Sequence, residues 1–135
     1  SGVTPPAPVI VDKKAVDYIA KVYVFSPGRE VKVDVNNGRS KHRFQNDKRA
    51  ETIIGGAKKG LNHLTFTTKV LEGATGKEPL DIRVFLMSQV PGVKPQAVFQ
   101  YRLTPAQIIS GETAKLSSST SFTVTAAHQK ALMKK

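Results

Sequence analysis

Cysteine and tryptophan are both absent from this chain of 135 residues. The lack of cysteine excludes disulfide bonds, thiolate nucleophiles and cysteine-based zinc sites. It leaves the compartment open, because reducing and oxidising environments both contain cysteine-free domains. No apolar run approaches the ~20 residues that a membrane-spanning helix needs. At this length the chain fits one domain, which can fold through hydrophobic burial without covalent crosslinks.

Motifs of catalysis and metal binding are also missing. The three histidines, His42, His63 and His128, have neither H-E-x-x-H nor H-x-x-x-H spacing, so we expect no metal site. No serine lies in a G-x-S-x-G motif, and the ten Asp and Glu residues are scattered, mostly beside a basic residue. The sequence therefore predicts a protein that is not an enzyme and has no cofactor and no small-molecule substrate.

One glycine-rich stretch has part of the spacing of a nucleotide-binding loop. Residues 55–60 have the G-x-x-x-x-G spacing of a phosphate-binding loop, but Leu61 and Asn62 follow where Lys and Ser or Thr are required. The residues from Leu61 onward also alternate like a strand rather than a helix. We interpret the stretch as a hairpin connection with glycines at positive φ.

Positive charge is abundant: 21 Lys and Arg against 10 Asp and Glu give a formal net charge of +11. Such a charge attracts polyanions, including nucleic acid, anionic membrane surfaces, lipopolysaccharide and acidic glycans. The basic residues are spread along the whole chain, however, so the charge could also serve solubility alone. Composition narrows the class of partner without naming one.

The clearest local structure lies between Arg29 and Leu71. Residues 30–35 alternate with period two, Asn37-Gly38 is the preferred pair for a type I′ turn, and residues 40–44 alternate again, which predicts a β-hairpin. A two-residue loop sets the register of the two strands. The inward pairs are then Val35 with Ser40, Val33 with His42, and Val31 with Phe44.

The opposite face of the hairpin is rich in basic residues. It places Lys41 opposite Asp34 and Arg43 opposite Lys32, and the second pair is a like-charge pair that destabilises an isolated sheet. Two interpretations stay open: an anionic partner covers this face, or its long side chains extend into water. The candidate residues for binding a polyanion or partner are Lys32, Arg39, Lys41, Arg43, Lys48, Arg49, Lys58 and Lys59.

Further strands follow from the same alternation. They are predicted at Tyr18–Phe25, Thr52–Ile54, Leu61–Leu71, Leu80–Met87, Ala97–Leu103 and Ser121–Thr125. We expect connections at the polar residues 46–51 and the serine-rich residues 116–120, and a short helix from Thr104-Pro105 to Gly111. About seven or eight strands and one short helix predict an antiparallel β-sandwich, immunoglobulin-like in broad shape. A small β-barrel is the alternative.

The two ends of the chain differ from the middle. Residues 1–11 form a proline-rich lead, residues 12–126 the predicted sandwich domain, and residues 127–135 a basic tail that could form a helical turn. A proline-rich lead is typical of a tether behind a processed N-terminus. On that basis we expect an extracytoplasmic protein, in the periplasm or at the cell surface, while a cytoplasmic location stays open.

Three classes of function fit these observations. The first is a non-enzymatic interaction module for adhesion, a surface structure or a secretion system, which binds protein partners through a sheet face or an edge strand such as Tyr18–Phe25. The second is a protein that binds nucleic acid, another anionic polymer or an anionic membrane surface through its basic face. The third is a structural subunit of a phage or virus.

Overall fold

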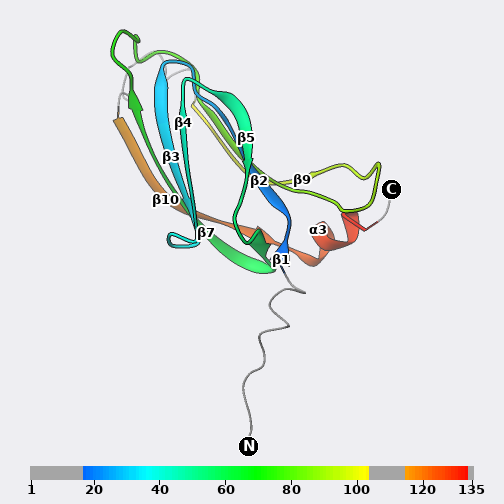
Figure 1. Cartoon of the computed structure of the whole chain (residues 1–135). Helices are drawn as coiled ribbons and strands as arrows, with labels where there is room; N and C mark the ends of the chain where they lie inside the picture. Colours follow the sequence, from blue (N-terminus) through cyan, green and yellow to red (C-terminus); the bar gives the residue numbers. More distant parts are fainter. Residues whose placement is uncertain (1–16, 104–114, 134–135) are drawn as a thin grey trace, which may run out of the picture.

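The chain folds into two four-stranded antiparallel sheets that pack face to face (Figure 1). The computed structural model describes residues 17–103 and 115–133. We call the sheet with strand order β5-β2-β8-β9 sheet I and the sheet with order β10-β7-β3-β4 sheet II. A short two-stranded pair, β1-β6, lies beside them. The predicted antiparallel β-sandwich is confirmed, and the alternative of a barrel is wrong because the sheets do not close.

The elements follow one another in a simple order. Their bounds are β1 (Asp17–Tyr18), β2 (Ala20–Phe25), β3 (Arg29–Val35), β4 (Ser40–Gln45), β5 (Lys48–Thr52), β6 (Ala57–Lys58), β7 (Gly60–Val70), β8 (Asp81–Leu86), β9 (Gln96–Arg102), β10 (Lys115–Val124) and α3 (Ala126–Ala131).

The strand order has an internal symmetry. In the first half of the chain, β2 enters sheet I, the β3–β4 hairpin enters sheet II, and β5 returns beside β2. In the second half, β7 enters sheet II, the β8–β9 hairpin enters sheet I, and β10 returns beside β7. Exchanging the halves converts the order of one sheet into that of the other. Each half therefore ends with a pair of consecutive edge strands in opposite sheets, β4 with β5 and β9 with β10.

The core fills the space between the sheets. Burial alternates along β2, β4, β7 and β8, so every second side chain points inward. On β7 the predicted inward side is confirmed, because Asn62, Leu64, Phe66 and Thr68 are all buried. The ring of Phe66 lies 4.9 Å from that of Tyr101 on β9, a contact that joins the two sheets across the core.

The β3–β4 hairpin has the predicted register. Val35 pairs with Ser40, Val33 with His42 and Val31 with Phe44. Asn37 and Gly38 have φ of 56° and 90°, and the Arg39 N–H donates to the Asn36 carbonyl, as a type I′ turn requires. The turn chemistry of two residues thus decides which side chains of both strands enter the core.

The polar stretch after this hairpin was predicted wrongly. Residues 48–51, expected as a connection, belong to β5, whereas Ile53 and Ile54, expected in a strand, follow its end. β5 lies at the edge of sheet I, and none of its side chains is buried. Such a strand needs no apolar alternation, because backbone hydrogen bonds to β2 hold it in place.

The serine-rich stretch 116–120 was also predicted wrongly as a connection. It forms the first half of β10, which pairs with β7 without interruption from Lys115 opposite Lys69 to Val124 opposite Gly60. Serine has little intrinsic preference for strands, so only the long partner strand β7 stabilises this conformation. The helix predicted at 104–111 lies outside the described residues.

Polar contacts hold the start of β3 and the start of the C-terminal helix α3 in place. Arg29 at the start of β3 is fully buried, and its Nη2 donates to the carbonyls of Gly76 and Glu78, both at 3.0 Å. Burial lowers the pKa of this guanidinium. At the other end of the chain, Thr125 caps α3 through a capping box with His128, and Leu132 after the helix is buried.

The glycine-rich loop provides a test of this fold. Gly56 and Gly60 have φ of 66° and 88°, but a Cβ added to Gly56 would lie 2.1 Å from the Tyr18 carbonyl oxygen, whereas one added to Gly60 meets no atom within 4 Å. We expect Gly60→Ala to cost about 1–2 kcal/mol of unfolding free energy from its backbone conformation alone. Gly56→Ala should cost about 1–3 kcal/mol more, because the β1–β6 pair must shift. Urea unfolding of both variants measures this difference, and equal costs would contradict the close approach of β1.

Candidate functional site

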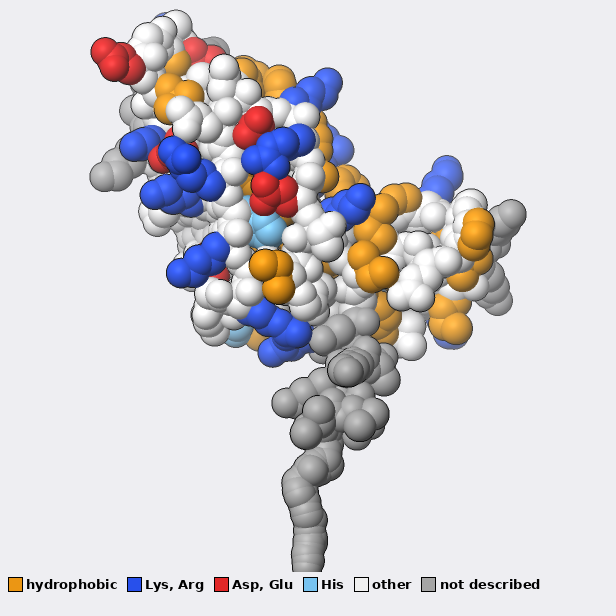
Figure 2. Space-filling model, in the orientation of Figure 1, with side chains coloured by type: hydrophobic (Ala, Val, Ile, Leu, Met, Phe, Trp, Pro, Cys, Tyr) orange, Lys and Arg blue, Asp and Glu red, His pale blue; other side chains and the backbone are white. Residues whose placement is uncertain are grey.

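The eight predicted basic residues do not form one site. Figure 2 shows Lys and Arg side chains spread over the visible face of the sandwich, with Asp and Glu among them. Three of the eight lie on the outer face of sheet II, and the others lie on β5 in sheet I, in the β3–β4 turn, or near β6. The first group is Lys32, Lys41 and Arg43; the second is Lys48, Arg49, Arg39, Lys58 and Lys59.

The outer face of sheet II is hollowed where the three basic residues meet. The hollow has a volume of about 350 Å³, and its outward-pointing lining side chains are Lys32, Asp34, Lys41, Arg43, Thr65 and Thr67. Strand register explains this gathering, because Lys32 pairs with both Arg43 and Thr67, and Asp34 pairs with both Lys41 and Thr65. We call this feature the basic hollow.

Arg43 at the rim of the basic hollow is held by a carboxylate. Its Nε donates to Glu30 Oε2 at 2.7 Å, and Lys69 approaches the other oxygen at 3.5 Å. Glu30 points to the outer face as predicted, yet its side chain is only 8% exposed. The hydrogen bond from Arg43 is the main reason that the pKa of Glu30 lies below its usual value.

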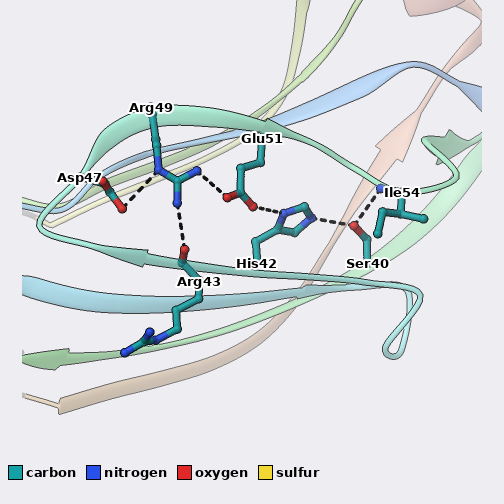
Figure 3. A network of polar contacts seen from close by, with 7 residues as sticks. All are labelled: Ser40, His42, Arg43, Asp47, Arg49, Glu51 and Ile54. Atoms are coloured by element: carbon teal, nitrogen blue, oxygen red, sulfur yellow. Dashed lines mark hydrogen bonds and ion pairs between the residues drawn. The ribbon is translucent and has the colours of Figure 1, made fainter.

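A second polar cluster lies between the edge strands β4 and β5 (Figure 3). Ser40 Oγ is 2.6 Å from His42 Nε2, and His42 Nδ1 is 2.6 Å from Glu51 Oε1. Because ionised Glu51 can only accept, Nδ1 carries the hydrogen of the His42–Glu51 hydrogen bond, and Nε2 is left to pair with the Ser40 hydroxyl. We call this chain of hydrogen bonds the Ser–His–Glu relay.

The relay has the connectivity of a hydrolase triad, but its accessibility differs. Ser40 is 1% exposed and the His42 side chain 3% exposed, so a substrate carbonyl has no path to the hydroxyl oxygen. Ser40 Oγ also accepts the Ile54 N–H at 2.8 Å. A nucleophile must present a free lone pair to the reacting carbon, and here that oxygen faces the protein interior.

The relay joins two strands that belong to different sheets, β4 in sheet II and β5 in sheet I. Arg49 on β5 extends it: its guanidinium pairs with Glu51, donates to the Arg43 carbonyl at 3.1 Å and lies 4.7 Å from the Phe44 ring centre. Burial raises the pKa of Glu51, but the hydrogen bonds from Arg49 and His42 outweigh it and leave that pKa below its usual value. Side chains thus close the β4–β5 edge of the sandwich.

Sequence reasoning missed this cluster, although one signal was present. Ser40 and His42 were both predicted to face inward, and two consecutive polar residues on a buried face require partners. Glu51 could not be assigned as that partner while residues 46–51 were interpreted as a connection. Arg49, one of the candidate binding residues, takes part in this edge contact.

Three of the four outer strands in the described part of the sandwich are protected against further pairing. Edge strand β4 is joined to β5 by the relay, and both strands carry charged residues along their length. Edge strand β9 contains a bulge, since Val84 pairs with Phe99 and Phe85 with Ala97, which leaves Val98 as an extra residue.

Within the described part of the chain, residues 116–124 of edge strand β10 have none of these protections. The strand is ten residues long, its register with β7 is unbroken, and residues 116–124 include no charged side chain, no proline and no glycine. Its outer face carries the exposed side chains Ser117, Ser119, Ser121 and Thr123. Long, regular and uncharged edges are the ones that accept another strand.

Residues 17–103 and 115–133 lack two features. No group of three or more His, Cys, Asp or Glu side chains is placed to hold a metal ion there. No helix in these ranges is long and apolar enough to cross a bilayer. Comparison of the chain with protein-family models, with curated proteins and with solved structures finds no match.

The relay predicts a specific loss of stability. Ser40→Ala removes the acceptor of the Ile54 N–H and the partner of His42 Nε2, so one part-buried and one buried polar group lose their hydrogen bonds. We expect a cost of about 1–3 kcal/mol in unfolding free energy. The control Ser117→Ala, at an exposed position, should change it by less than about 0.5 kcal/mol. Chemical denaturation measures both, and equal effects would show that the relay contributes nothing.

The lowered pKa of Glu51 predicts the direction of a pH effect. Its usual value is 4.5 and the folded value is lower, so its contribution to stability is complete above pH 4.5 and is lost as the pH falls through the folded pKa. The stability difference between the wild type and Glu51→Gln should therefore shrink from about pH 5 to about pH 3. Urea midpoints across this range test it, and a difference that stays constant or grows on acidification would contradict the assignment.

Proposed function

We propose that this chain is a non-enzymatic assembly module that pairs with a second copy of itself along β10. The observation that carries the proposal is the contrast between the β10 edge and the three protected outer strands. Strand addition supplies a row of backbone hydrogen bonds without requiring any particular side chain. It would join two copies of sheet II into one continuous sheet.

The residues of β10 favour a second copy of β10 as the strand that pairs with it. In an antiparallel pair with its two-fold axis at Thr120, Ser119 meets Ser121 and Ser117 meets Thr123 on the outer face. On the inner face Leu116 meets Val124, and Ser118 meets Phe122. Hydroxyl pairs and apolar pairs both favour strand association, and no charged residue of 116–124 meets its like. β4 in the same arrangement, with its axis at His42, would bring Lys41 opposite Arg43.

The expected edge strand Tyr18–Phe25 cannot serve this role. β2 lies between β5 and β8, so both of its backbone edges are already paired. The buried Ser40 hydroxyl supports the non-enzymatic part of the proposal, because the one triad-like cluster in the described residues lacks access to substrate.

The net charge of the chain predicts how this association depends on salt concentration. Two copies that each carry +11 repel one another, while residues 116–124 of the paired strands contribute no charge of their own. Salt screens the repulsion and leaves backbone hydrogen bonds almost unchanged. Self-association should therefore strengthen as salt rises, in contrast to any contact between opposite charges.

Sedimentation velocity tests the proposal. We expect a monomer–dimer equilibrium between about 10 µM and about 1 mM protein, in the range of small interfaces. The dimer fraction should rise from about 50 mM to about 500 mM salt. Ser119→Lys places a cation at the edge and should abolish the dimer. The control Thr52→Lys adds the same charge at an exposed position of β5 and should leave dimerisation within about twofold of wild type.

Two results would overturn the proposal. One is a monomer at every concentration and salt, which would leave the β10 edge to a foreign strand or to none. The other is a dimer that Ser119→Lys and Thr52→Lys weaken equally, which would place the interface elsewhere. Thermal melts of both variants establish that each is folded.

A further inference from the structure

The basic hollow lies on the outer face of sheet II and is lined by residues of β3, β4 and β7, not of β10. We infer that it binds the sulfate or phosphate groups of an anionic polysaccharide. Three strands place the cations and two threonines in the hollow, β10 adds two serines beside it, and two of the cations lack ion pairs within the described residues.

Strand register places the relevant side chains in two parallel rows. One row runs Ser117, Thr67, Lys32, Arg43 across β10, β7, β3 and β4, and the next runs Ser119, Thr65, Asp34, Lys41. Neighbouring strands lie about 4.8 Å apart, so each row extends over about 15 Å. Cations occupy the β3–β4 half of this surface and hydroxyl groups occupy the β7–β10 half.

The cations in the hollow are incompletely neutralised. Arg43 is paired with Glu30. Lys32 and Lys41, by contrast, form no ion pair with any carboxylate of the described residues. Asp34, the one carboxylate that lines the hollow, accepts the Gly38 N–H through Oδ1. The direct pairing of Lys32 with Arg43 destabilises the unliganded sheet, and an oxyanion between them would remove that repulsion.

The hydroxyl rows favour a sugar polymer over a nucleic acid. Thr65, Thr67, Ser117 and Ser119 are exposed and can exchange hydrogen bonds with sugar hydroxyl groups. Single-stranded nucleic acids bind by stacking bases on aromatic side chains. The phenylalanines of this sheet that the structure describes, Phe44, Phe66 and Phe122, all point inward and are buried. A polysaccharide can lie across the strands, with its anionic groups on the lysines and its hydroxyls over the Ser and Thr rows.

Fluorescence titration with a labelled heparin hexasaccharide tests the inference in protein kept dilute enough to remain monomeric. The charge-reversal variant Lys32→Glu/Lys41→Glu should weaken binding by at least about tenfold. The control Lys77→Glu/Lys94→Glu changes the net charge equally at exposed loop positions, and it should weaken binding by less than about threefold. Wild-type affinity should fall as salt rises, which is opposite to the salt dependence of dimerisation.

Two other probes distinguish the ligand class. Neutral maltohexaose should not bind, because it lacks the anionic groups. A single-stranded oligothymidylate of matched charge should bind more weakly than the hexasaccharide and should be affected equally by both charge-reversal variants.

Three outcomes would overturn the inference. The first is no binding of the hexasaccharide at low salt. The second is an equal loss in the two charge-reversal variants, which would attribute binding to net charge alone. The third is an oligonucleotide that binds as tightly as the hexasaccharide and depends on Lys32 and Lys41, which would make nucleic acid the ligand of this hollow.

Discussion

The turn at Asn37 and Gly38 determines the side of sheet II on which every residue of β3 and β4 lies. Side chains alternate with period two, so a slip of one residue would exchange the inward and outward sets of a strand. The positive φ angles of this turn prevent that slip. The buried valines of β3, the inward position of His42 and the outward position of Lys41 all depend on it. Both the basic hollow and the Ser–His–Glu relay are consequences of this single register.

The β4–β5 edge and the β9–β10 edge of the sandwich differ in how they are protected against pairing with a further strand. At the β4–β5 edge, side chains of opposite sheets meet, and the relay and Arg49 cover backbone groups that would otherwise be open. At the symmetry-related β9–β10 edge, β9 is bulged whereas β10 is long and regular. Among the described residues, the same topology therefore yields one edge closed by side chains and one long, regular strand, because only β4 and β5 place charged and hydrogen-bonding side chains between them.

The fold class, the hairpin and the inward face of β7 could be predicted from sequence, because alternation and turn chemistry are local signals. β5 and the first half of β10 were missed for one physical reason: edge strands carry little or no apolar alternation, and their backbone partners are distant in sequence. Three of the eight candidate basic residues share a hollow, and the other five lie elsewhere. The relay was missed because it needs Glu51 beside His42, a contact between two sheets.

The sequence by itself determined which side of each alternating strand enters the core, since that choice depends on side-chain period and on the φ preferences of Asn and Gly. Apart from the β3–β4 hairpin, only the tertiary structure decided which strands are neighbours. Pairing of β10 with β7 converts a run of serines into an open edge, and the approach of β5 to β4 closes the opposite one. These outcomes depend on hydrogen bonds between segments far apart in the chain, and backbone hydrogen bonds leave almost no trace in the residues that form them.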